Sequence, residues 1–121
     1  MQRGEINFII IRHKRTNVNV SFENTDKINV FNVEKIKNNL VEIVRVPNTN
    51  LILSFKGVKF IDSSGFRALN FISKLAKNYN SSLVLKDVNK ELFELFDLVK
   101  KFGRLDVKNI HRANYKTVNA A

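Results

Sequence analysis

The 121-residue sequence contains no cysteine, one proline and only two histidines. Without thiols the chain forms neither disulfides nor thiolate metal sites, and it has no cysteine nucleophile. His13 and His111 are far apart in the sequence and lack metal-ligand spacing. No apolar run is long enough to cross a bilayer, and the start of the chain, interrupted by Glu5, does not resemble a secretory signal. We therefore expect a single-domain cytoplasmic protein without a metal or other cofactor.

Acidic residues are scarce relative to basic ones. The sequence has 21 lysines and arginines against 11 acids, a formal charge of +10. Such an excess is compatible with nucleic acid or an anionic membrane surface as a partner. The basic residues are scattered along the sequence, however, as is typical of solvated faces. A nucleic-acid or anionic-surface binder is therefore an alternative ranked last, and steep weakening of binding with salt would identify it.

Short strands and amphipathic helices alternate along most of the chain. β-branched and alternating apolar residues predict an N-terminal hairpin, strands over 6–12 and 18–22. Apolar residues at helical spacing predict three helices, at 32–44, 63–78 and 89–102. Apolar runs predict strands at 51–55 and 83–85, with 104–107 a candidate final strand. Residues 24–29 are expected to form a polar loop.

This order of elements predicts an α/β sandwich: a mixed, mostly parallel sheet of four or five strands with three to four helices and the antiparallel hairpin. We expect one domain over residues 1–107 and a flexible basic tail over 108–121, which has little to bury. The expected core faces of the three helices comprise Val33, Ile36, Leu40, Ile43 and Val44; Leu69, Ile72, Ala76 and Tyr79; and Leu92, Leu95, Phe96, Val99 and Phe102.

The segment Asp62-Ser63-Ser64-Gly65 stands between a short apolar run and the second predicted helix. A helix N-terminus favours anions, phosphate included. One of the two serines can cap the helix, which leaves the other directed into solvent. Gly65 allows a tight turn or the close approach of another surface. By itself, such a tetrapeptide is more commonly only a capped turn.

With its flanks, Gly57-Val58-Lys59-Phe60-Ile61 before it and an amphipathic helix after it, the segment resembles the signature of the STAS domain family (sulfate transporter and anti-sigma factor antagonist). The resemblance extends over about residues 6–107 and is most specific over 51–69. It implies a regulatory module without catalytic activity. In the antagonist branch, the unphosphorylated protein binds an anti-sigma factor that is a serine kinase. The kinase phosphorylates the first motif serine and a phosphatase restores it.

The resemblance implies a bacterial phosphoprotein that regulates transcription. Its partners would be the anti-sigma factor kinase and a serine phosphatase, with no small-molecule substrate and no membrane insertion. We expect a monomer or weak dimer. The phosphorylated residue would be Ser63, ahead of Ser64, which is the expected helix cap. The expected partner-binding residues are Asn29, Asn32, Asp62, Ser63, Ser64, Gly65, Arg67, Phe71 and Lys74.

Two places differ from the family pattern. Phe66-Arg67 stands where Leu-Gly is usual, and Arg67 could either fold back on a phosphate at Ser63 or obstruct a kinase. The loop before the first helix lacks its usual glycine, and Asn29 stands where the family has an aspartate near the phosphorylation site.

The role of Phe71 is open from the sequence. It shares a stripe of the second helix with Arg67 and Lys74, which would make it an exposed interface residue. A shift of one residue in the helix phase would instead place it in the core.

Two other functions compete with this switch. Ser63 as a catalytic nucleophile lacks a neighbouring base, because His13 lies on the hairpin and His111 in the tail. A second STAS function remains: a scaffold subunit of a transporter or stress-signalling complex, without phosphorylation. Incubation with a cognate kinase and ATP, followed by mass measurement, separates the scaffold from the switch.

Overall fold

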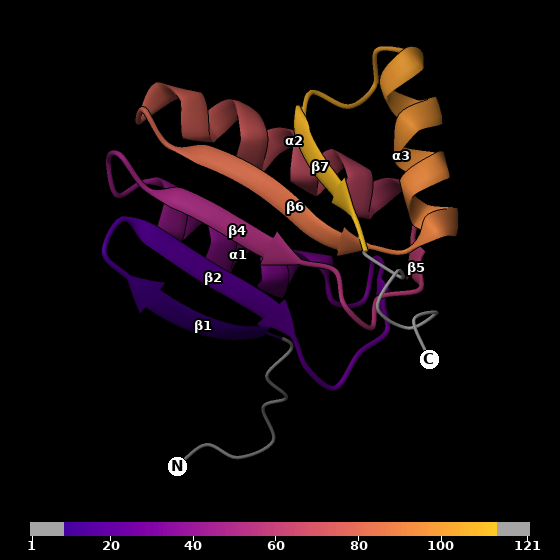
Figure 1. The fold of residues 1–121 in the computed structure, drawn as a ribbon, viewed down its shortest axis with the longest axis horizontal. Helices are drawn as coiled ribbons and strands as arrows, with labels where there is room; N and C mark the ends of the chain where they lie inside the picture. The colour runs from indigo at the N-terminus through magenta and orange to yellow at the C-terminus, as the bar shows by residue number, and fades with distance from the viewer. Residues whose placement is uncertain (1–8, 114–121) are drawn as a thin grey trace, which may run out of the picture.

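Two sheets form the framework of the protein in the computed structural model, which describes residues 9–113 (Figure 1). The larger sheet has five strands in the order β1-β2-β4-β6-β7, and the smaller one pairs β3 with β5. Only β1 and β2 are antiparallel; the other pairs are parallel. The elements are β1 (Ile9–Lys14), β2 (Asn17–Phe22), β3 (Lys27–Ile28), α1 (Val33–Val44), β4 (Asn50–Ser54), β5 (Phe60–Ile61), α2 (Ser63–Asn78), β6 (Ser82–Val88), α3 (Lys90–Lys101) and β7 (Asn109–Arg112).

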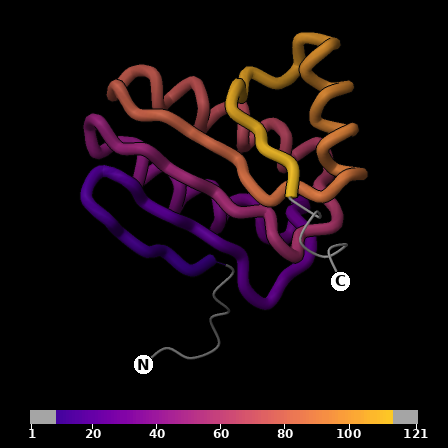
Figure 2. Tube along the Cα trace, in the orientation of Figure 1, coloured from indigo at the N-terminus to yellow at the C-terminus, as the bar shows by residue number. Residues whose placement is uncertain are grey.

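The fold class expected from the sequence is confirmed, with five strands in the main sheet, three helices and the N-terminal hairpin. Residues 6–8 of the first expected strand lie outside the described residues. Helices α1 and α2 pack against each other on one face of the sheet (Figure 1). Helix α3 and the β1–β2 hairpin lie at opposite sides of the molecule (Figure 2). No helix within residues 9–113 is long and apolar enough to span a membrane.

The core lies between the sheet and the helices. All five residues expected on the inner face of α1 are buried, and so are Leu69, Ile72 and Ala76 of α2, while Tyr79 is half-buried. Aromatic rings connect α3 to this core, because Phe96 makes edge-to-face contacts with both Phe55 and Phe66.

The C-terminal part of the chain differs from the expectation. Residues 104–107 form no strand, although Leu105 and Val107 are buried. Their backbone is held by α2 side chains instead: the Asp106 N–H donates to Asn70 Oδ1 at 2.7 Å. The final strand, β7, begins at Asn109, inside the segment assigned to the tail, and residues 114–121 lie outside the described residues.

Two other expectations are corrected. The loop expected over 24–29 contains β3, a strand of two residues that is too short to give a periodic signal. The apolar stripe expected on the last helix is wider than the face of α3 that packs against the core. Leu92 and Phe96 are buried, but Leu95 is 36% exposed and Phe102 is 73% exposed, because α3 contacts the core along one narrow face at the edge of the fold.

Candidate functional site

The motif lies where the small sheet leads into α2. Strand β5 pairs in parallel with β3, so that Phe60 lies beside Lys27 and Ile61 beside Ile28. Because the two strands are parallel, the segments that follow them leave the pairing in the same direction. The loop 29–32, which leads into α1, is therefore next to residues 62–65, which lead into α2.

The N-cap of α2 is Asp62, not Ser64 as expected. One carboxylate oxygen, Oδ1, accepts hydrogen bonds from the Gly65 N–H at 3.1 Å and from the Ser64 hydroxyl at 2.5 Å. The other, Oδ2, accepts from the Val30 N–H at 3.2 Å. A charged acceptor two residues earlier occupies the cap position, so the Ser64 hydroxyl donates to it.

These hydrogen bonds favour the ionised form of Asp62. The bond from the Ser64 hydroxyl is the main cause that lowers the pKa of Asp62, and the N–H groups of Gly65 and Val30 add to it, while partial desolvation opposes them. The motif therefore carries a fixed negative charge at the start of α2.

Ser63 is the first residue of α2 and is exposed. Its hydroxyl has no hydrogen-bond partner among residues 9–113. Because Asp62 caps the helix, neither serine is needed as the cap acceptor. The Ser63 hydroxyl is thus accessible to another protein.

Gly65 is required by close packing. A Cβ atom at this position would lie 2.5 Å from Ile61 Cγ1 and 3.1 Å from Ile28 Cγ2. Both isoleucines belong to the small sheet, so the first turn of α2 lies directly on β3 and β5. Gly65 is buried, and the close packing that requires it positions the two serines before it.

The loop 29–32 is organised by two asparagine side chains. Asn32 is 6% exposed; its Nδ2 donates to the Lys27 carbonyl at 2.8 Å and to Thr25 Oγ1 at 3.3 Å, and its Oδ1 accepts from the Asn29 N–H at 2.9 Å. Asn29 Oδ1 accepts from the Phe31 N–H at 3.0 Å. The Asn32 side chain is therefore turned inward and shapes the loop, and its expected contact with a partner stays a prediction.

The same loop exposes two apolar side chains that were not among the expected site residues. Phe31 is 91% exposed and Val30 is 62% exposed. The available signal was two adjacent apolar residues within a polar stretch. On α2, Phe71 is 48% exposed, so the interpretation as an exposed residue is confirmed. The Lys37 ammonium lies 4.8 Å from the centre of its ring.

A shallow hollow of about 300 Å³ separates α1 from α2 beside the motif, and its lining residues are Val33, Glu34, Lys37, Ser64, Arg67, Ala68 and Phe71. Arg67 and Phe71 therefore share one surface with Ser64, which follows Ser63 in α2. Lys74 is farther along the helix, near Asp106. We use "Ser63 surface" for Val30, Phe31, Ser63, Arg67 and Phe71.

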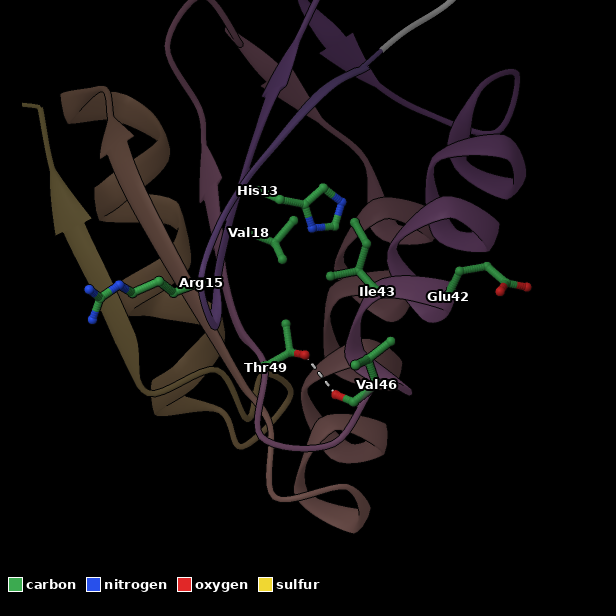
Figure 3. Close-up of a pocket in the computed structure, with 7 residues that line it drawn as sticks. All are labelled: His13, Arg15, Val18, Glu42, Ile43, Val46 and Thr49. Carbon is green, nitrogen blue, oxygen red and sulfur yellow. Dashed lines mark hydrogen bonds between the residues drawn. The ribbon is translucent and has the colours of Figure 1, made fainter.

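The structure gives Ser63 no histidine partner. His13 lines a cavity of about 280 Å³ at the opposite end of α1, together with Arg15, Val18, Glu42, Ile43, Val46 and Thr49 (Figure 3). Its ring points towards Ile43 (Figure 3). His111 lies on β7. Within residues 9–113, no three His, Asp or Glu side chains are grouped to hold a metal ion.

Solved structures support this fold. The chain is similar to an anti-sigma-factor antagonist (STAS) domain protein from Planctomyces limnophilus, with 16% identity over 93% of this chain and 96% of the other and a TM-score of 0.73. The anti-sigma factor antagonist SpoIIAA in its unphosphorylated form has 13% identity, coverage of 91% and 93%, and a TM-score of 0.65. Its phosphorylated form, from Bacillus, has 12% identity, coverage of 93% and 97%, and a TM-score of 0.62.

A transporter is also similar: murine Slc26a9, an anion transporter, with 15% identity over 88% of this chain but 18% of the transporter and a TM-score of 0.64. No curated protein matches the sequence. The family model described as STAS domain matches residues 9–116, nearly the whole chain. This chain therefore belongs to the STAS domain family.

Proposed function

We propose that this chain is a cytoplasmic protein-interaction switch of the anti-sigma factor antagonist kind. In this proposal the Ser63 surface docks onto an anti-sigma factor with serine-kinase activity, and phosphorylation of Ser63 ends the contact. One observation carries the proposal: the exposed Ser63 hydroxyl lies at the start of α2 next to the loop that exposes Val30 and Phe31.

The exposed apolar side chains supply the docking energy in this proposal. Aromatic residues surrounded by polar ones are typical anchors of protein interfaces. Phe31 lies on the loop before α1, next to the start of α2, and Phe71 lies on α2, which begins with Ser63. Neither ring is needed for the core, so their exposure is better explained by a partner than by stability.

Phosphorylation would change the charge of this surface. A phosphoserine adds roughly −1.5 to −2 charges at neutral pH. The helix N-terminus favours such a group, but Asp62 already holds one negative charge there. Arg67, one helical turn after Ser63 and exposed, is the cation that would pair with the phosphate. A partner that packs on Phe31 would then have to desolvate a dianion.

Membership of the STAS family and the similarity to SpoIIAA, solved in both phosphorylation states, support this choice. The proposal involves no catalysis by the chain itself. A kinase would bring the phosphoryl group, and a phosphatase would remove it.

The test uses an anti-sigma factor kinase from the same genome, with ATP. Intact-mass measurement should show one added phosphate on the wild type and on Ser64→Ala, the matched control, and none on Ser63→Ala. Binding by calorimetry should be retained in Ser63→Ala and reduced at least about tenfold in Ser63→Asp. Identical binding of the alanine and aspartate variants contradicts the switch.

The similarity to an anion transporter favours a second candidate, a scaffold subunit that is never phosphorylated. Stable binding of a partner to this surface, with no phosphate incorporated under any condition, would support the scaffold over the switch.

A further inference from the structure

One face of the main sheet has no helix over it in the part of the chain that the structure describes. Figure 1 shows this face: the strands lie in front of α1 and α2, and α3 lies at the side. Strands β2, β4, β6 and β7 run parallel to one another, and parallel sheets are ordinarily covered on both faces. The uncovered face is therefore a candidate docking surface.

Strand alternation fixes the direction of the side chains on this sheet. Leu53 of β4 and Leu85 of β6 are fully buried on the side of the helices. Ile52 and Lys86, their neighbours in sequence, therefore point to the opposite side. The strand register extends this opposite side to β1, β2 and β7. We call it the open face of the sheet.

The cations of the open face come from three strands that are far apart in the sequence. Arg12 and Lys14 lie on β1, beside Asn19 and Asn17 of β2, and Lys86 lies on β6. All three cations are exposed, and none forms an ion pair within residues 9–113. The order of the strands thus places on one face basic residues that are scattered along the sequence.

This positive charge is not balanced by acids of the same sheet. Asp87 of β6 is the one acidic residue in the five described strands. It is half-buried, and its Oδ2 already accepts a hydrogen bond from the Ser54 hydroxyl at 2.9 Å. The open face is therefore complementary to an anionic partner.

The centre of the open face is apolar and is flanked by amides. Ile52 and Val84 are half-buried neighbours on β4 and β6. Asn19 of β2 lies beside Ile52, and Asn109 of β7 lies beside Val84. Neither asparagine side chain has a hydrogen-bond partner among the described residues. A small apolar surface with a free amide on each side suits a flat ring that has polar edges, such as a nucleobase.

We propose that the open face binds single-stranded RNA, with bases on Ile52 and Val84 and phosphates at Arg12, Lys14 and Lys86. Guanidinium planes and imidazole rings also stack on bases, and His111 of β7 lies exposed on the same face. The five strands make the face about 19 Å wide at about 4.8 Å per strand. This width suits roughly four nucleotides, the lower end of the site sizes of single-strand binders.

Other anionic partners fit this face less well. The major groove of a DNA duplex is about 12 Å wide, which is narrower than the sheet. A membrane surface favours apolar side chains that protrude, whereas Ile52 and Val84 are half-buried. RNA is preferred to single-stranded DNA because its 2′-hydroxyl is a further hydrogen-bond partner for free amides.

Fluorescence anisotropy of the full chain with a labelled, unstructured RNA of about 12 nucleotides tests the inference, at about 50 mM salt. The wild type should bind, and a fourfold rise in salt should weaken binding roughly twentyfold, as expected for about three phosphate contacts. The triple variant Arg12→Gln/Lys14→Gln/Lys86→Gln should bind at least about tenfold more weakly. No binding by the wild type overturns the inference.

A second triple variant is the matched control, because it removes the same charge from exposed residues on α1 and α3: Arg45→Gln/Lys90→Gln/Lys100→Gln. It should bind within about threefold of the wild type. Equal weakening by the two triple variants would show that only the total charge matters, and it would overturn the assignment to the open face. Circular dichroism checks that both variants are folded.

The amides test whether bases are contacted. Asn19→Ala/Asn109→Ala should weaken RNA binding about three- to tenfold with an unchanged salt slope, and should bind inorganic polyphosphate like the wild type. Unchanged RNA binding by this variant, or tighter binding of the wild type to vesicles of phosphatidylserine and phosphatidylcholine than to RNA, overturns the proposal. All these variants leave the Ser63 surface intact, so the result is independent of the proposed switch.

Discussion

The carboxylate of Asp62 accepts a hydrogen bond from the backbone N–H of Val30, 3.2 Å away, across 32 residues of sequence. The same carboxylate caps α2 through the Gly65 N–H. One side chain thus fixes the loop that exposes Val30 and Phe31 relative to the helix that begins with Ser63. This contact therefore fixes the apolar side chains of Val30 and Phe31 in position relative to the Ser63 hydroxyl.

Substitution of Asp62 should therefore affect both stability and binding. Asp62→Ala removes the cap and the acceptor for Val30, and we expect a loss of about 1 kcal/mol in the free energy of unfolding, a typical value for an N-cap. Urea unfolding measures it. Asp62→Asn is the matched control, because its amide oxygen can still cap the helix. An unchanged stability of Asp62→Ala would contradict the capping role.

The depressed pKa of Asp62 leads to a prediction for acid. The ordinary value is near 3.8, and the folded value is lower. The unfolded state therefore binds more protons between the two values, so the contribution is complete above about pH 4 and is lost as the pH falls through the folded pKa. The free energies of unfolding of the wild type and of Asp62→Asn should differ by a constant amount at higher pH, and this difference should disappear in acid.

Ser64→Ala serves as the control for this titration. Loss of its hydroxyl, the main cause of the shift, should move the pKa of Asp62 upwards, which carboxyl NMR can follow directly. A titration of Asp62 that is unchanged in Ser64→Ala would show that the hydrogen bond has no such effect.

The helices and main strands were predictable because each buries one periodic face. Every expected inner residue of α1 is buried, and in β2 the buried Val18 and Val20 alternate with less buried neighbours, as expected. Strand β3 was not predictable, because two residues give no period, yet its pairing with β5 brings the two loops together. The contact of Val30 with Asp62 depends on that pairing, so the part played by the loop was hidden as well.

Errors in the candidate site have a similar origin. A capping residue was expected at the motif, but the sequence does not decide between a carboxylate and a hydroxyl one or two residues apart. Asn32 was expected among the partner-binding residues because it lies on the loop beside the motif, and the sequence does not show that its side chain bonds to backbone groups inside that loop. On α3, composition indicates an apolar helix and does not say which of its residues the small domain has room to cover.

Phe31 should be important for binding and unimportant for folding. Because it is 91% exposed, Phe31→Ala should change the free energy of unfolding by no more than about 0.5 kcal/mol. If Phe31 anchors the partner, the same change should weaken binding by about 2 kcal/mol, roughly thirtyfold. Phe102→Ala, at a ring that is 73% exposed on α3, is the matched control and should bind normally. Equal binding of both variants would exclude Phe31 from the interface.

Gly65 gives the sharpest prediction for stability. In Gly65→Ala the new Cβ would lie 2.5 Å from Ile61 Cγ1 and 2.8 Å from Cδ1, so α2 must shift away from the small sheet. We expect a loss of about 1–3 kcal/mol, as for other overpacked sites. Ile61→Ala removes both clashing atoms but leaves a cavity. The double variant Gly65→Ala/Ile61→Ala should thus lose less than the sum of the two single losses, which a denaturation cycle measures. Strict additivity would mean that the contact between the helix and β5 is not what requires glycine here.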